Sequence, residues 1–246
     1  MRHTLNMKAL SLFFVVLLCS PRCFGDVGMD VYQTFSLDEH TFGVAGEIRV
    51  LKDSRLLRSD IQLFKDSPMD IGTAFTGIKK FEKNPPRSAQ LLFLNQAKKV
   101  IQKITMEKAY ASIKQVSLGS RKNFILVTED DSAGWGSYNG PITRILEVNR
   151  QKMQWLKAMD SVKHKKETIV LMKSVKANWK IVQAQSGNDV LVIESLFNPE
   201  LKESFFTNYI RYHRINDQWI KSVRMKPIAW ESNGTDDVFD PKDFPE

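Results

Sequence analysis

Apolar and polar residues alternate early in the chain, as the side chains of a half-buried β-strand do. Residues 31–37 carry Val31, Phe35 and Leu37 on one side, and the next stretch carries Phe42, Val44, Ile48 and Val50 on one side. A polar turn at 52–55 leads to Leu57, Ile61 and Leu63, which mark a returning strand. The pattern predicts an antiparallel meander of three strands with one buried face.

The spacing of apolar residues changes after Pro85 and Pro86. Intervals of three and four now recur, first in Ala97, Val100, Ile101 and Ile104 and then in Met106, Ala109, Tyr110 and Ile113. The outer side carries Lys98, Lys99, Lys103 and Lys108. This spacing predicts one main helix over about residues 96–116 that ends near Gly119.

Hairpin patterns dominate the chain from residue 141 onward. Polar turns at 149–152, 186–189 and 216–217 each lie between two apolar stretches. In two of these hairpins a tryptophan, Trp155 or Trp219, follows the turn within three residues. The expected fold class is therefore α+β and β-rich, built from antiparallel meanders and hairpins with one main helix.

The glycine-rich stretch 134–141 is the best interior boundary of the chain. The expected parts are a signal peptide (1–25), an N-terminal β-meander plus helix (26–132), C-terminal antiparallel hairpins (141–230) and an acidic tail (231–246). The alternative is that residues 26–230 form a single domain.

The first 25 residues have the pattern of a secretory signal peptide. Arg2 and Lys8 precede an apolar run over 9–18, and Gly25 supplies a small residue at the expected cleavage site. The run is about ten residues long, too short to span a bilayer as a helix. We expect cleavage near Gly25 and a soluble product, secreted or periplasmic, with no transmembrane segment; a short anchor that is never removed is the alternative.

Composition agrees with a folded, exported protein. Of the 246 residues, 42% are hydrophobic and 26% are charged, which excludes a disordered or coiled-coil protein. Both cysteines, Cys19 and Cys23, lie in the expected signal peptide. The mature protein then has no thiol, which excludes cysteine nucleophiles, thiolate metal sites and disulfides.

Positive charge is concentrated in the second half of the chain. Residues 141–230 carry 16 Lys and Arg against 8 Asp and Glu, and an acidic tail follows. Aromatic rings interleaved with cations bind sugars and anionic polymers through stacking and charge. The candidate binding residues are Lys173, Lys180, Tyr209, Arg211, His213, Trp219 and Arg224. The plainer interpretation is a solvated sheet face, over which the tail either folds back or stays frayed.

Glu129, Asp130 and Asp131 are the candidate acid–base residues of an alternative function, and the catalytic residues are otherwise unknown. Paired carboxylates are the machinery of many glycoside hydrolases. Adjacent strand residues point to opposite faces, however, so these three are poorly placed to flank one bond. A solvated turn and a metal-binding loop are the other interpretations of the triplet.

Other common chemistries leave no pattern in the chain. The glycine-rich stretch does not match the dinucleotide or phosphate-loop spacings, and the histidines are widely separated, so we expect no nucleotide, no cofactor and no metal. Export also disfavours nucleic acid. We therefore expect a non-catalytic binding or interaction protein of the cell envelope or extracellular space, with a basic, aromatic surface for an anionic envelope polymer or another protein. The alternatives are an exported hydrolase of a glycan or other envelope polymer, and a structural envelope subunit.

Overall fold

The structure of the protein, a computed structural model, describes residues 28–61, 81, 83–119, 122–130, 140–149, 152–184, 187–198, 204–232 and 239–246. The expected signal peptide, most of the glycine-rich stretch 134–141 and Asp131 lie outside the described residues. Within those ranges, no helix combines the length and the apolar character needed to cross a membrane.

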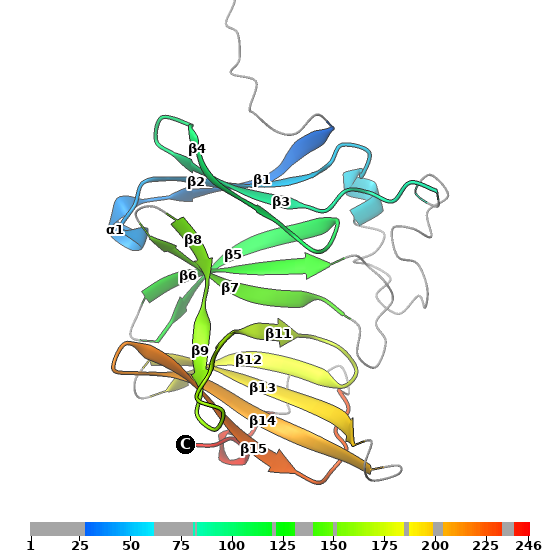
Figure 1. The fold of residues 1–246 in the computed structure, drawn as a ribbon, viewed down its shortest axis with the longest axis vertical. Helices are drawn as coiled ribbons and strands as arrows, with labels where there is room; N and C mark the ends of the chain where they lie inside the picture. Colours follow the sequence, from blue (N-terminus) through cyan, green and yellow to red (C-terminus); the bar gives the residue numbers. More distant parts are fainter. Residues whose placement is uncertain are drawn as a thin grey trace, which may run out of the picture.

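The described strands form three sheets, which we name A, B and C (Figure 1). Sheet A has the order β1 (Met29–Leu37), β2 (Gly46–Asp53), β3 (Gln90–Asn95), β4 (Val100–Thr105). Sheet B has the order β11 (Val170–Met172), β7 (Ile142–Asn149), β6 (Lys122–Asp130), β5 (Tyr110–Leu118), with β8 (Lys152–Trp155) paired to β7. Sheet C has the order β10 (Lys166–Thr168), β9 (Lys157–Asp160), β15 (Gln218–Lys226), β14 (Ser204–Ile215), β13 (Gly187–Asn198), β12 (Ala177–Ala184). Neighbouring strands are antiparallel except β9 and β15, which are parallel.

The sheets stack in the order A, B, C from top to bottom of Figure 1, and sheet B is the middle layer. Ile48 and Phe93 of sheet A pack with Ile125 of sheet B in one core. Phe124 on the other face of sheet B belongs to a second core with residues of sheet C. Because sheet B is buried on both faces, its stretch 124–127 is apolar at every position instead of alternating.

The helix predicted over residues 96–116 is wrong. These residues contribute β4 and most of β5, and the described residues contain only short helical turns: α1 (Glu39–Phe42), residues 58–61, residue 81 and η3 (Pro241–Asp243). Along β4 exposed residues alternate with partly buried ones, which is a period of two. Val100 and Ile104 lie four residues apart, a spacing that fits a helix and also a strand. Ile104 packs against the core shared with sheet B, whereas a β-bulge places Val100 in a separate cluster with Leu94, so tertiary packing decides the outcome.

The meander of sheet A is present, but one of its predicted strands is misplaced. Residues 58–61 are helical where the returning strand was expected, and the third strand of the meander is β3. The polar side chain of Asp38 caps α1 by accepting a hydrogen bond from the Thr41 N–H at 2.8 Å. Gly43, with a φ of 69°, ends that helix.

The three hairpins of the second half are present. β7 pairs with β8, β12 with β13, and β14 with β15. In the turn between β14 and β15, Asn216 and Asp217 have φ values of 46° and 65°. Two consecutive positive φ values are typical of a two-residue turn whose twist matches the flanking strands, and Asn and Asp tolerate them better than most residues.

A ribbon that bends between two sheets forms one side of the sandwich. The chain leaves sheet B after β8, enters sheet C with β9, returns along β10, and rejoins sheet B with β11. Leu156 and Ile169 are the two crossing residues; both are buried, and the Ile169 N–H donates to the Leu156 carbonyl at 3.0 Å. The ribbon places residues of β8, β9 and β10 beside the turn of the β14–β15 hairpin.

The carboxylate of Asp53 ties the end of β2 to the segment that leads into β3. It is 1% exposed and accepts hydrogen bonds from the backbone N–H groups of Arg55 and Arg87 and from the Arg55 guanidinium. Burial works to raise its pKa, but these hydrogen bonds outweigh burial and hold the pKa well below the usual 3.8. The carboxylate is therefore ionised in the folded protein at all but strongly acid pH.

We expect Asp53→Asn to lower the free energy of unfolding by about 2–3 kcal/mol at pH 7, because charge-assisted hydrogen bonds are lost. Since the folded-state pKa is lowered, the stabilisation is fully present above about pH 4 and is lost as the pH falls below that value. Urea unfolding of both proteins at pH 7 and pH 3 measures this. The difference between them should shrink at pH 3, and an equal difference at the two pH values contradicts the assignment.

Candidate functional site

The predicted acid–base residues are placed differently from one another. Glu129 is 2% exposed, and its Oε2 accepts hydrogen bonds from the backbone N–H groups of Glu107 at 2.6 Å and Lys108 at 3.1 Å. Its Oε1 forms an ion pair with Arg144. Asp130, next along β6, is opposite Tyr110 in the register, and Asp131 lies outside the described residues. A cavity of about 340 Å³ adjoins Glu129, but both of its oxygens are already engaged.

The residues of the predicted basic surface do not all lie on one face of the protein. Lys180, Tyr209, Arg211, His213 and Arg224 lie on the face of sheet C that points away from sheet B, which we call the outer face of sheet C. Trp219 lies on the opposite face, in the core between sheets B and C. The ammonium of Lys173 lies 5.6 Å from the centre of the Trp179 ring. A pattern of alternation identifies residues that share a face but does not say what covers that face.

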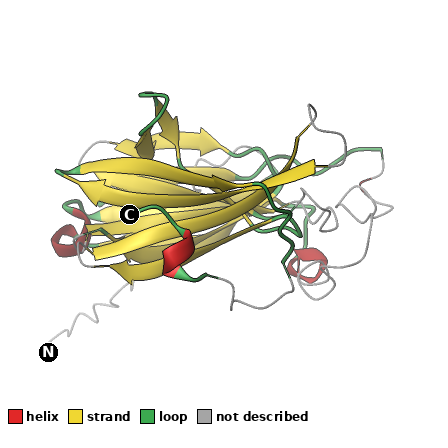
Figure 2. Cartoon of the chain, turned by 90° about the horizontal axis from the view of Figure 1, so that it is seen from below, coloured by secondary structure: helices red, strands yellow, loops and turns green. Residues whose placement is uncertain are grey.

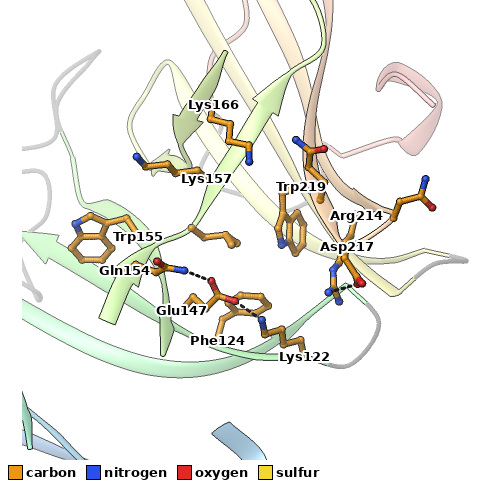
Figure 3. A pocket seen from close by; sticks show the side chains of 13 residues that line it. Lys122, Phe124, Glu147, Gln154, Trp155, Lys157, Lys166, Arg214, Asp217 and Trp219 are labelled. Atoms are coloured by element: carbon orange, nitrogen blue, oxygen red, sulfur yellow. Dashed lines mark hydrogen bonds and ion pairs between the residues drawn. The ribbon is translucent and has the colours of Figure 1, made fainter. Parts of the chain in front are cut away.

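A pocket of about 560 Å³ opens between sheets B and C, where the bent ribbon meets the β14–β15 turn (Figure 3). Its apolar wall is formed by Phe124 of β6, Trp155 of β8, Leu156 and Trp219 of β15. The rings of Phe124 and Trp219 meet edge to face with centroids 6.1 Å apart. Both are nearly fully buried, whereas Trp155 is half-buried. Trp155 also packs against the core between sheets A and B, with the Arg144 guanidinium 6.0 Å from the centre of its ring.

Two acidic residues of the pocket are neutralised by neighbouring cations. Glu147 forms an ion pair with Lys122 and accepts a hydrogen bond from the Gln154 amide at 2.7 Å. Burial works to raise the pKa of Glu147, but the hydrogen bonds from Lys122 and Gln154 outweigh it and hold the pKa below its usual value. Asp217 pairs with Arg214 at 2.6 Å. Glu147 is thus a hydrogen-bond acceptor in the pocket wall and is poorly suited to act as a general acid, whereas Asp217 is exposed at the turn.

Two further lysines give the pocket its excess positive charge. Lys157 of β9 and Lys166 of β10 are exposed and line the opening, and neither has an ion-pair partner among the residues that the structure describes. Figure 3 shows both at the upper rim, above the Glu147–Lys122 pair. The lining residues include four cations against two anions. Among the described residues, no group of three or more His, Cys, Asp or Glu side chains is placed to hold a metal ion.

Sequence reasoning singled out only Trp219 among the binding residues of this pocket. The available signal was the similarity of the two hairpins in which Trp155 and Trp219 follow a polar turn. The structure brings these two hairpins to the same pocket, with the lysines of the ribbon beside them. Lys157 and Lys166 carried no comparable signal. Lysines such as Lys157 are common on exposed strands, and Lys166 ends the basic run 163–166, whose other members do not line the pocket.

Comparisons with known proteins do not indicate a function, so the proposal below rests on the geometry of the site. No protein-family model, no curated protein and no solved structure matches the chain.

Proposed function

We propose that the protein is an exported, non-catalytic binding protein of the cell envelope or extracellular space, and that the pocket between sheets B and C recognises an anionic polysaccharide. The observation that carries the proposal is the pair Lys157 and Lys166, exposed and without ion-pair partners among the described residues, beside the half-buried Trp155. Sugar rings stack on indole faces, and carboxylate, sulfate or phosphate groups pair with ammonium groups. The pocket offers both features within about 560 Å³.

The expectation of export rests on the sequence of the first 25 residues, which lie outside the described residues. An envelope location agrees with an anionic polysaccharide as partner, because such polymers are abundant at cell surfaces. A mature N-terminus near Asp26 in the exported protein checks this part of the proposal.

The hydrolase alternative finds little support in the geometry around Glu129. A general acid must be able to carry a proton, whereas this carboxylate accepts two backbone hydrogen bonds and pairs with Arg144. These contacts engage both carboxylate oxygens and leave neither of them for a substrate. A structural role for Glu129 is therefore the better interpretation.

The test of the proposed function is charge reversal at the pocket. We expect Lys157→Glu combined with Lys166→Glu to weaken binding to polygalacturonate or dextran sulfate by about tenfold or more, because two attractive contacts become repulsive. Calorimetric titration at 50 mM and at 300 mM salt measures the affinity, and the wild-type affinity should fall at the higher salt. Neutral dextran serves as the uncharged ligand.

The matched control is Lys99→Glu combined with Lys114→Glu, which makes the same change in net charge away from the pocket. Both control lysines are exposed, and β5, which carries Lys114, is the edge strand of sheet B farthest from β8. The control should bind nearly as well as the wild type. Equal weakening of both double variants would show that affinity follows net charge and would remove the pocket from the proposal, and failure of the wild type to bind any anionic polysaccharide would overturn the function.

A further inference from the structure

The outer face of sheet C holds a second group of basic and aromatic residues, none of which lines the pocket. The register places Lys180, Leu191 and Arg211 in one row across β12, β13 and β14, and Tyr209 and Arg224 in an adjacent row. Residues 239–246, which include η3, lie across this face, and Figure 2 shows η3 in front of the strands when the molecule is seen from below. We call residues 239–246 the tail.

An aromatic anchor holds the tail. Phe244 is 2% exposed and meets Tyr209 edge to face with ring centroids 5.5 Å apart. Its other neighbours are apolar: Leu191, Ile193 and Trp230 form the rest of this cluster, and Phe239 stacks on Phe244 at 5.9 Å. These side chains surround the Phe244 ring, and we call the site that they form the socket.

Three cations around the socket contact the tail. Arg224 donates to the carbonyl of Lys242 at 2.8 Å, and Arg211 donates to the carbonyl of Pro245 at 3.3 Å. Lys226 pairs with the carboxylate of Asp243, and its ammonium lies 4.6 Å from the centre of the Tyr209 ring. The two arginines bind main-chain carbonyls, which any peptide has. Lys226 binds an acidic side chain directly before the phenylalanine, and this contact depends on the sequence of the peptide.

One arginine of this face is held in place by the sheet itself, and two buried polar atoms of the face have no hydrogen-bond partner on the tail. Arg211 is fixed by the buried carboxylate of Asp189 at 2.8 Å. On the same face, His213 Nδ1 and Trp230 Nε1 are buried without a hydrogen-bond partner among the described residues. The tail does not extend the sheet either, since its one backbone–backbone hydrogen bond among the described residues, Asp243 N–H to Asp240, is internal. An occupant held by side-chain contacts alone can leave without breaking a strand pairing.

We propose that the outer face of sheet C is a peptide-binding site for an acidic, phenylalanine-containing segment of a partner protein, and that the tail is its competing intramolecular ligand. The tail shows the recognition chemistry: a phenyl ring in the socket, a carboxylate on Lys226, and main-chain carbonyls on Arg211 and Arg224. A partner segment can bind only those molecules whose tail is released. Its apparent association constant is therefore the intrinsic constant multiplied by the released fraction.

The test uses the full chain and a labelled peptide with the sequence of residues 239–246. We expect Phe244→Ala in the protein to increase the affinity for this peptide by about tenfold or more, because the competing anchor is lost. Fluorescence anisotropy measures the binding. Asp243→Lys, which leaves Phe244 in place, is a milder variant expected to act in the same direction, so the proposal stays testable if Phe244→Ala is poorly folded.

Controls separate this site from the polysaccharide pocket. A peptide with alanine in place of its second phenylalanine, and a protein that carries Lys226→Glu in addition to Phe244→Ala, should both lose binding. The double variant Lys157→Glu, Lys166→Glu should leave peptide binding unchanged, whether or not it loses binding of the polysaccharide. Folded tail variants that bind the peptide no better than the wild type would overturn the proposal. A wild-type dimer that dissociates on Phe244→Ala would also overturn it, since the tail would then join two copies of this chain.

Discussion

The free energy of unfolding is expected to fall by about 3–5 kcal/mol on Phe124→Ala and by about 2–5 kcal/mol on Ile125→Ala, because each truncation leaves a cavity in a packed core. These neighbouring residues of β6 are 1% and 0% exposed, and they belong to different cores. Large losses at both positions are expected only if sheet B has packed layers on both faces. Urea unfolding followed by circular dichroism measures the losses.

The control for these two variants is Ile101→Ala in β4. Ile101 is an equally apolar strand residue but is 43% exposed, so its truncation should cost less than about 1 kcal/mol. If Phe124→Ala or Ile125→Ala is tolerated as well as Ile101→Ala, one face of sheet B is open to solvent and the three-layer arrangement is wrong.

Glu129→Gln is expected to lower the free energy of unfolding by about 3 kcal/mol, because breaking a buried ion pair leaves its partner charge uncompensated. The partner is Arg144, whose side chain is 15% exposed. Glutamine keeps the size of the side chain and one acceptor oxygen, but its amide nitrogen must face either Arg144 or the backbone N–H groups, so the loss includes the hydrogen bonds on that side. Urea unfolding at pH 7 measures it, and binding of the anionic polysaccharide should be unchanged under conditions where the variant is folded.

Arg144 supplies the matched control for this prediction. Its second carboxylate partner, Glu107, lies at 2.6 Å but is 67% exposed. Glu107→Gln should therefore change stability by less than about 1 kcal/mol, since exposed ion pairs contribute little. A Glu129→Gln variant as stable as Glu107→Gln, together with loss of a glycan-hydrolysing activity of the wild type, would favour the hydrolase alternative.

Strands and hairpins with strong local signals could be predicted from the sequence. The alternation in β1 and β2 reports burial on one face, and the Asn216–Asp217 turn reports a backbone that few other residue pairs adopt. The segment 96–116 could not be assigned by periodicity, because apolar residues four apart fit both a helix and a strand. The β-branched residues of this segment favour a strand, and their number distinguishes the two possibilities better than the spacing does.

The candidate sites could be predicted only in part. The shared face of Tyr209 and Arg211 followed from alternation, but the tail that covers them is brought there by contacts across more than 30 residues. Trp155 and Trp219 are 64 positions apart in the chain and belong to different cores. Both line the pocket because the parallel pairing of β9 with β15 brings their segments together. Glu129 is predicted only as one of three adjacent acidic residues, whereas its environment comes from residues 107, 108 and 144.

By itself the sequence determined the β-rich character of this protein, most of its strands and the turns that join them, because these depend on the backbone preferences and burial pattern of neighbouring residues. Only the tertiary structure decided which faces are covered. It buried both sides of sheet B, placed the tail on the outer face of sheet C, and left Lys157 and Lys166 open beside Trp155. Those outcomes depend on packing between distant segments, whose free energy no local pattern records.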